Sequence, residues 1–118
     1  KAPPANSTPT SVSRAAGIAL TKALSKEFGP YNILVNTVCI GLIKAGQHET
    51  RWKRQCEQDP SLTLDQYYVN TVQARGVPLG RIGEGAEAGD VICFLASDRA
   101  SYLTGVALNI DGGASPVS

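Results

Sequence analysis

The chain has 118 residues, of which 42% are hydrophobic and 18% charged, and its formal net charge is +1. This length fits one globular domain, and the near-neutral charge excludes a strong electrostatic footprint for nucleic acid or an acidic membrane. No apolar run approaches the roughly 20 residues that a membrane span needs, and no signal segment opens the sequence. The sequence begins at Lys1 and contains no Met, which suggests processing or a piece of a longer chain.

The three cysteines predict neither a metal site nor a disulfide framework. Cys39, Cys56 and Cys93 lie far apart, form no C-x-x-C pair, and are accompanied by a single histidine, His48. This composition lacks zinc-ligand spacing, and an odd number of thiols favours free cysteines in a reducing cytoplasm. Cys39 and Cys93 stand in apolar runs, so we expect both in the core.

The chain opens with a Pro-, Ala- and Ser/Thr-rich stretch at residues 1–8, which predicts an extended lead-in. A helix is expected next, with Thr8 as its N-cap and Pro9 as its first residue, where a missing N–H costs nothing. Gly29 and Pro30 should end this helix.

Residues 32–40 (NILVNTVCI) form a nearly continuous apolar run that Gly41 bounds. A short, β-branched run of this kind is typical of a central strand buried on both faces in a parallel sheet. Residues 9–43 therefore predict one unit made of a helix and a core strand.

Residues 44–76 are more polar and predict a helical excursion laid over the scaffold. One helix is expected over His48–Gln58, and the Thr63-x-x-Gln66 spacing resembles a capping box for a second helix that Gly76 closes. The excursion also carries a small basic cluster, which we interpret as a solvated face: Arg51, Lys53 and Arg54.

Residues 77–118 predict a closing helix, a last strand and a tail. The helix is expected over Glu84–Ser97, and the strand over the apolar run at 106–110, with an Asp-Gly-Gly turn behind it. We expect the buried face of this helix to come from Val91, Ile92, Phe94 and Leu95.

The order of elements predicts an α/β fold with about four helices and two parallel strands joined by a right-handed crossover. Two strands alone make a marginal sheet, and a parallel sheet needs both faces covered. The pattern is that of half a fold, completed by a missing half or by a copy of itself.

Two stretches resemble the C-terminal half of short-chain dehydrogenases/reductases: residues 11–46 (SVSRAAGIALTKALSKEFGPYNILVNTVCIGLIKAG) and residues 78–113, with Leu-Ala-Ser-Asp, Tyr-x-Thr-Gly and Asp-Gly-Gly. The resemblance covers residues 9–113 and implies the second half of a doubly wound, Rossmann-type parallel sheet. It also implies an NAD(P)-dependent oxidoreductase that transfers hydride between the cofactor and an alcohol or carbonyl.

The resemblance places the family's catalytic Tyr at Thr10 and its Lys at Arg14. A Thr hydroxyl is a far weaker acid than the Tyr phenol, and Arg keeps the charge without Lys chemistry. The implied cofactor-binding positions are Arg14, Ile40, Gly41 and Ile43. The Thr expected beside the cofactor is Ala45, and the family's Gly-rich phosphate turn is not found in the sequence.

Two functions stay open. The chain is a fragment or truncated member of this oxidoreductase family, inactive alone, or a non-catalytic oligomerisation or regulatory module built on the same half-fold. The expected partner is a homo-oligomer or a complementary N-terminal half, with neither nucleic acid nor membrane.

An unrelated site on the excursion is a third, weaker hypothesis: His48 with Glu49, Cys56 or Asp65 lacks nucleophile or metal spacing. The aromatic residues of the excursion fit either of two roles, lining a substrate pocket or packing the excursion onto the scaffold: Trp52, Tyr67 and Tyr68.

Overall fold

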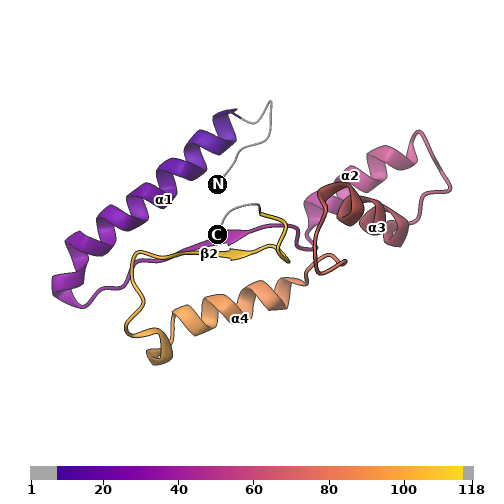
Figure 1. The fold of residues 1–118 in the computed structure, drawn as a ribbon. Coiled ribbons are helices and arrows are strands. Elements are labelled where there is room, and N and C mark those ends of the chain that lie inside the picture. The colour runs from indigo at the N-terminus through magenta and orange to yellow at the C-terminus, as the bar shows by residue number, and fades with distance from the viewer. Residues whose placement is uncertain (1–7, 116–118) are drawn as a thin grey trace.

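The computed structural model describes residues 8–115, except for the side chain of Thr10; the lead-in expected at residues 1–7 lies outside this range. The order of elements in Figure 1 is helix, strand, two helices, helix, strand. The helices and strands are α1 (Thr8–Phe28), β1 (Thr37–Ile40), α2 (Gly46–Cys56), α3 (Leu64–Arg75), α4 (Gly85–Leu95) and β2 (Ala107–Ile110), with 3₁₀ turns at Gly29–Tyr31 and Asp98–Ala100.

The long helix α1 ends where the sequence predicts. Gly29 and Pro30 enter a 3₁₀ turn rather than continuing the helix, because proline lacks an N–H to donate. Asn32 then takes a left-handed conformation (φ 58°) and donates its backbone N–H to the Gly29 carbonyl. This cap reverses the chain, and the following segment runs back along α1 toward the sheet (Figure 1).

The two strands form a parallel pair with Thr37 opposite Ala107 and Ile40 opposite Ile110, as predicted. β1 is shorter than the predicted run of residues 32–40, because side-chain hydrogen bonds interrupt the ladder before Thr37, where one backbone bond remains, from the Gly105 N–H to the Val35 carbonyl (2.7 Å). The Asn36 amide donates to the Leu103 carbonyl (2.8 Å) and accepts from the Val106 N–H (3.2 Å). These two hydrogen bonds of the Asn36 side chain fix the register of the strands where the ladder begins.

A small core lies where the excursion meets the carboxyl end of the sheet. Its buried members come from the loop after β1, from α3 and from the segment after α3: Leu42, Val72, Val77 and Ile82. Thr63 accepts a hydrogen bond from the Gln66 N–H and caps α3, and Gly76 ends α3 at φ 59°. The predicted helix start and end are confirmed, but the capping box is only half formed, because the Gln66 side chain donates to Asn70 (2.8 Å) instead of to the Thr63 backbone.

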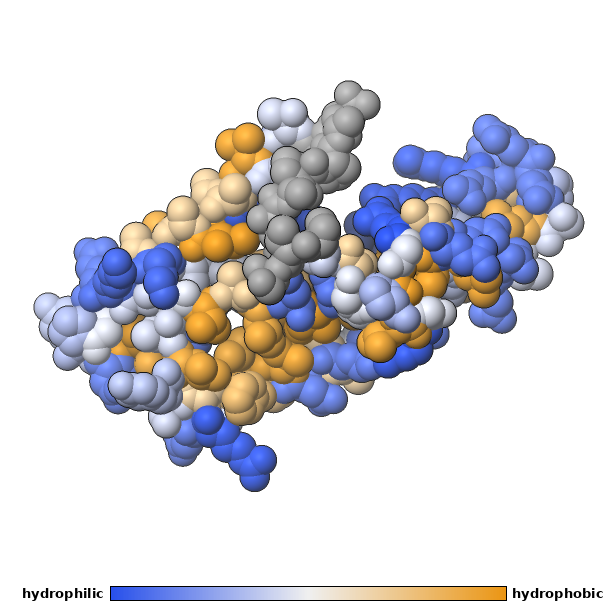
Figure 2. Space-filling model, viewed as in Figure 1, coloured by the Kyte–Doolittle hydropathy of each residue, from blue (hydrophilic) through white to orange (hydrophobic). Residues whose placement is uncertain are grey.

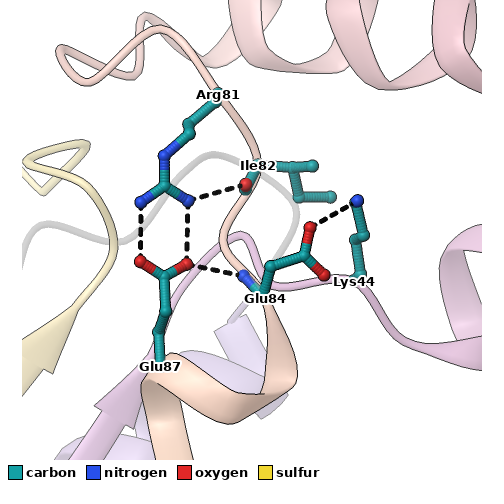
Figure 3. Close-up of polar contacts among 5 residues, drawn as sticks. All are labelled: Lys44, Arg81, Ile82, Glu84 and Glu87. Atoms are coloured by element: carbon teal, nitrogen blue, oxygen red, sulfur yellow. Dashed lines mark hydrogen bonds and ion pairs between the residues drawn. The ribbon is translucent and has the colours of Figure 1, made fainter.

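The N-terminus of α4 carries two ion pairs, and one of them, Lys44 with Glu84, ties it to the loop after β1 (Figure 3). Arg81 binds Glu87 through two parallel bonds of 2.8 and 2.6 Å, and Glu87 also accepts the Glu84 N–H (2.8 Å). The bonds from Arg81 and Glu84 lower the pKa of Glu87 to about 2. Lys44 pairs with Glu84 at 2.5 Å, so charged side chains hold the start of the crossover helix beside the excursion.

Much apolar surface stays uncovered. The accessible surface is 8280 Å², against about 6,100 Å² for a compact monomer of this mass. The radius of gyration is 17.0 Å, against about 13.5 Å for a compact domain of 118 residues. Figure 2 shows hydrophobic residues gathered over the strand pair and its neighbouring helices, whereas the region of α2 and α3 is mostly hydrophilic.

Several burial predictions are therefore wrong. Ile92 and Phe94 of α4 are 48% and 42% exposed, Cys93 is also exposed, and Ile40 at the end of β1 is 50% exposed. α1 and α4 lie on opposite sides of the strand pair (Figure 1), but no further strand among residues 8–115 covers its edges. The helix and strand patterns were correct, and the partners they are shaped to pack against are not among these residues.

Within the described residues, no helix combines the length and the apolarity that crossing a membrane requires.

Candidate functional site

The predicted residues Arg14, Ile40 and Gly41 line one cavity at the carboxyl end of β1. Arg14 extends from the second turn of α1, Ile40 is the last residue of β1, and Gly41 follows it. The cavity has a volume of about 330 Å³, and its remaining wall is formed by Leu42, Gln47, His48, Arg51 and Arg75. The structure thus brings together three of the predicted positions with side chains of the excursion.

Thr10 lies in the first turn of α1, and its side chain is outside the described part of the structure. Ile43 does not join the cavity of Arg14. It is buried and lines a separate cavity of about 270 Å³ beside the Asp111-Gly-Gly turn. Its bridge to Gly83 uses the Leu42 carbonyl and the Lys44 N–H, so the backbone groups of Ile43 itself point away from Gly83.

Gly41 has a packing role that the sequence did not reveal. A Cβ at this position would lie 2.3 Å from the Asp111 Cβ and 2.8 Å from its Cα. Any larger residue would push β1 away from the end of β2, since backbone atoms cannot yield as a flexible side chain does. The close approach of two strand ends accounts for this glycine without any ligand.

The polar wall of the cavity is formed by residues of the excursion, and none of them is among the predicted cofactor-binding positions: Gln47, His48, Arg51 and Arg75. His48 is only 3% exposed, and its Nδ1 lies 3.4 Å from the Tyr67 hydroxyl. Burial lowers the pKa of His48, and the positive charges of Arg51 and Arg75 lower this pKa further. The imidazole is therefore neutral at pH 7, and the charge of the wall is carried by arginines. The only signal in the sequence was the basic cluster at 51–54, interpreted as a solvated face.

The aromatic residues of the excursion pack it together instead of lining the cavity of Arg14. Tyr67 is buried, with its ring 5.7 Å from that of Tyr68 and 6.3 Å from that of His48. The Trp52 indole donates to the Leu62 carbonyl at 2.8 Å and joins α2 to the turn before α3. Of the two roles left open for these rings, packing is the one that these contacts support.

The alternative site around His48 gains no support. No group of three or more His, Cys, Asp or Glu side chains in the described range is placed to hold a metal ion. Cys56 donates to the Leu62 carbonyl (3.4 Å) and serves the same turn as Trp52. His48 therefore contributes to the site as a buried neutral wall residue.

Comparison with known sequences identifies the family. Residues 2–115 match the family model described as enoyl-(acyl carrier protein) reductase. The chain is 37% identical over 102 residues to the oxidoreductase UcpA of Salmonella typhimurium and 35% identical over 103 residues to the 3-oxoacyl-[acyl-carrier-protein] reductase FabG of Aquifex aeolicus. These matches cover 86% and 87% of this chain but 36% of each relative, so the chain spans about a third of the length of these curated relatives.

Solved structures agree. The apo structure of a Pseudomonas aeruginosa short chain oxidoreductase, described as containing an atypical catalytic center, matches with a TM-score of 0.82 at 34% identity, over 92% of this chain and 41% of that protein. The L-sorbose reductase of Gluconobacter frateurii, complexed with NADPH and L-sorbose, matches with a TM-score of 0.83 at 28% identity, over 91% of this chain and 40% of that enzyme. The half-sheet, the crossover helix and the matched sequence together show that this chain belongs to the short-chain dehydrogenase/reductase family and corresponds to part of its Rossmann-type fold.

Proposed function

We propose that the chain supplies the part of an NADP(H)-dependent oxidoreductase that faces the nicotinamide and the substrate, and that it does not turn over by itself. The observation that carries this proposal is the convergence of Arg14, Ile40 and Gly41 on one cavity at the carboxyl end of β1. In open α/β sheets, ligands bind at the carboxyl ends of the strands. Residues 44–76 would then cover the substrate side.

The residues around this strand end fit part of a dinucleotide. A second cavity of about 430 Å³ lies between α1 and β1 and is lined largely by apolar groups, together with Arg14. Arg14 would donate hydrogen bonds to ribose hydroxyls, and the outward-facing backbone of Ile43 would hold the carboxamide. The bound nicotinamide would supply or accept the hydride. The Gly-rich phosphate turn of the family is not part of this sequence, so tight binding needs further chain.

The acid–base step lacks its usual group. Thr10 stands at the family's Tyr position, and an aliphatic hydroxyl ionises far above the phenol's pKa of about 10. A guanidinium group offers fixed positive charge and N–H donors, so Arg14 would stabilise an oxyanion but would not relay a proton. Relatives with an altered centre exist: the Pseudomonas aeruginosa oxidoreductase described as atypical also has an NADPH-bound structure.

The exposed apolar surface supports a partner that completes the sheet. The accessible surface exceeds that of a compact monomer by about 2,000 Å², which lies within the roughly 1,000–2,500 Å² that each partner buries at an obligate interface. The chain also covers only 36% of the curated relatives. A complementary segment of the family fold fits both observations.

Complementation tests the proposal. The chain is mixed with the part of the Salmonella typhimurium relative that it does not match, and NADPH fluorescence and mass in solution are measured. We expect a stable complex that binds NADPH, while the chain alone does not bind it. Micromolar binding by the chain alone, or a complex with no affinity for NADPH, would overturn the proposal.

The second candidate is a non-catalytic assembly module, and the same exposed faces of α1 and α4 favour it. It predicts a self-associated chain whose complex forms without any NADPH binding. NADPH fluorescence and mass in solution, measured in the same experiment, therefore distinguish the two candidate functions.

A further inference from the structure

Among the described residues, the cavity at the carboxyl end of β1 is lined by several cationic residues and by no acidic one. Its wall contains three guanidinium groups from three different helices: Arg14 from α1, Arg51 from α2 and Arg75 from α3. We name it the three-arginine cavity. Residues 14, 51 and 75 are far apart in sequence, so the fold itself gathers these charges. Like charges around one space repel each other unless an anion offsets them.

No lining residue supplies that anion. The wall of the three-arginine cavity contains no Asp or Glu. Among the described residues, both ion pairs use other cations, Lys44 with Glu84 and Arg81 with Glu87. Glu84 and Glu87 are thus paired with cations outside the cavity, and no ion pair of the described residues involves Arg14, Arg51 or Arg75, so the cavity keeps its positive charge.

The backbone of α2 adds to this field. α2 begins at Gly46, and its N-cap, Ala45, has no side chain that can accept a hydrogen bond from the first turn. Gln47 and His48 of that turn line the cavity, so the positive end of the helix dipole lies at its wall. Gln47 and the neutral His48 offer neutral polar groups beside the arginines.

We propose that the three-arginine cavity binds an anionic end of the substrate, a carboxylate or a phosphate, through Arg51 and Arg75 beside Arg14. Guanidinium forks match the paired oxygens of both groups. This inference rests on the proposed function, since it names the substrate class for that site. It assigns specificity to two residues of the excursion, which lies over the strand end where the reacting carbon would be held.

Other cations of the same helix provide a matched control. Lys53 and Arg54 belong to the last turn of α2 and are exposed, but neither lines the cavity. Removing one of them changes the net charge of the chain as much as removing Arg51 does. Any difference in anion binding between these variants therefore reports the cavity and not the overall charge.

The test is an anion titration of the chain without NADPH, using inorganic phosphate, malonate and uncharged malonamide. The ring protons of the single histidine, His48, are followed by NMR, and the fluorescence of the single tryptophan, Trp52, is followed in parallel. We expect phosphate or malonate to bind and to raise the pKa of His48, because the anion offsets Arg51 and Arg75. Malonamide should not bind.

Arg51→Gln and Arg75→Gln should each weaken anion binding about tenfold, since a charge-assisted hydrogen bond of ordinary strength is lost. Lys53→Gln and Arg54→Gln should leave it within twofold, and circular dichroism should show equal helix content in all variants. The relative affinities of phosphate and malonate identify the anion class.

Equal losses in the cavity and control variants, binding of malonamide, or binding of neither anion would overturn the inference. Its failure is distinct from that of the proposed function, because NADPH binding in the complemented mixture is measured separately. If anions bind the cavity but the complemented mixture binds no NADPH, the proposed cofactor-binding function is overturned, whereas the anion-binding site is retained.

Discussion

The excursion with its adjoining loops is more polar than the strand pair with its two flanking helices, yet its packing is more complete. In the first region, Tyr67, Val72 and Ile82 are each at most 7% exposed. The second leaves Leu20 of α1, Ile92 of α4 and Leu108 of β2 at least 40% exposed.

The difference follows from where each region finds its partners. The excursion folds on neighbours close in sequence: His48 meets Tyr67, and Trp52 meets Leu62. A parallel strand needs neighbours on both edges and helices on both faces, and these come from distant parts of a chain. A region whose packing partners are close in sequence can bury its own side chains. A sheet region stays exposed until the segments that form its remaining strands are present.

The largest expected effect is in the excursion. Tyr67→Ala removes a ring that is 4% exposed and packs on His48 and Tyr68, and should lower the free energy of unfolding by about 3 kcal/mol. Urea unfolding followed by Trp52 fluorescence measures it. Tyr102→Ala is the control, because Tyr102 is fully exposed and its loss should change stability by less than about 0.5 kcal/mol. Equal losses from the two variants would contradict the contrast between the regions.

The next effect is at the join between α1 and the entry to β2. Gly105 has φ +70°, and a Cβ there would lie 2.4 Å from the Ser25 hydroxyl oxygen. Gly105→Ala should therefore cost about 2 kcal/mol. Gly17→Ala in α1 meets nothing within 4 Å and should stabilise the helix by up to about 1 kcal/mol.

Hydrogen exchange locates the damage from Gly105→Ala. Amides of β1 and β2 should exchange faster, while those of α3 should keep their protection, because α3 packs on a separate core. Loss of protection in α3 would mean that the two regions unfold as one unit.

A smaller, pH-dependent effect is expected at the link between the regions. Arg81 and the Glu84 N–H hold the folded pKa of Glu87 near 2, below its ordinary 4.5. Because the folded pKa is depressed, the contribution of Glu87 is fully present above about pH 4.5 and is lost as the pH falls toward 2. Thermal unfolding of Glu87→Gln should show a shallower acid limb than the original chain, whereas Glu27→Gln, in α1, should retain the limb. If Glu87→Gln loses thermal stability with falling pH as steeply as the original chain, Glu87 does not contribute to the acid sensitivity of folding.

The smallest effect on stability is expected at the exposed face of α4. Ile92 is 48% exposed, so Ile92→Ser should change the free energy of unfolding by less than about 1 kcal/mol. The same change should lower self-association and weaken the complex with the complementary segment, as measured by mass in solution. A large loss of stability together with unchanged assembly would show that this face packs within the chain.

Most of the backbone could be predicted from local signals. Gly29 and Pro30 ended α1, Thr63 and Gly76 bounded α3, and the apolar runs paired as two parallel strands. These features depend on residues a few positions apart, where capping and hydrogen-bonding chemistry acts. Burial could not be predicted in the same way. A pattern such as Val91 to Leu95 records the face that is shaped for packing, whether or not a partner is present.

The lining of the candidate site was predicted only in part for the same reason. Arg14, Ile40 and Gly41 were predicted through a motif resemblance, and the structure places them around one cavity, while their roles stay predictions. Arg51 and Arg75 line that cavity because the turn between α2 and α3 brings the two helices together. The position of a charged residue in a helical sequence does not by itself reveal whether its side chain faces a cavity. The packing need for Gly41 was hidden too, since its neighbour Asp111 is 70 positions away in sequence.

The pairing of Thr37 with Ala107 also sets an order in time. During synthesis β1 emerges about 70 residues before its partner, a delay of several seconds at ordinary translation rates. Helices of the excursion form within microseconds and have their local contacts well before then. The Asn36 side chain, which bonds Leu103 and Val106, can close the sheet only after α4 has been made. Within the described residues, the pairing of β1 with β2 therefore forms after the local contacts of the excursion.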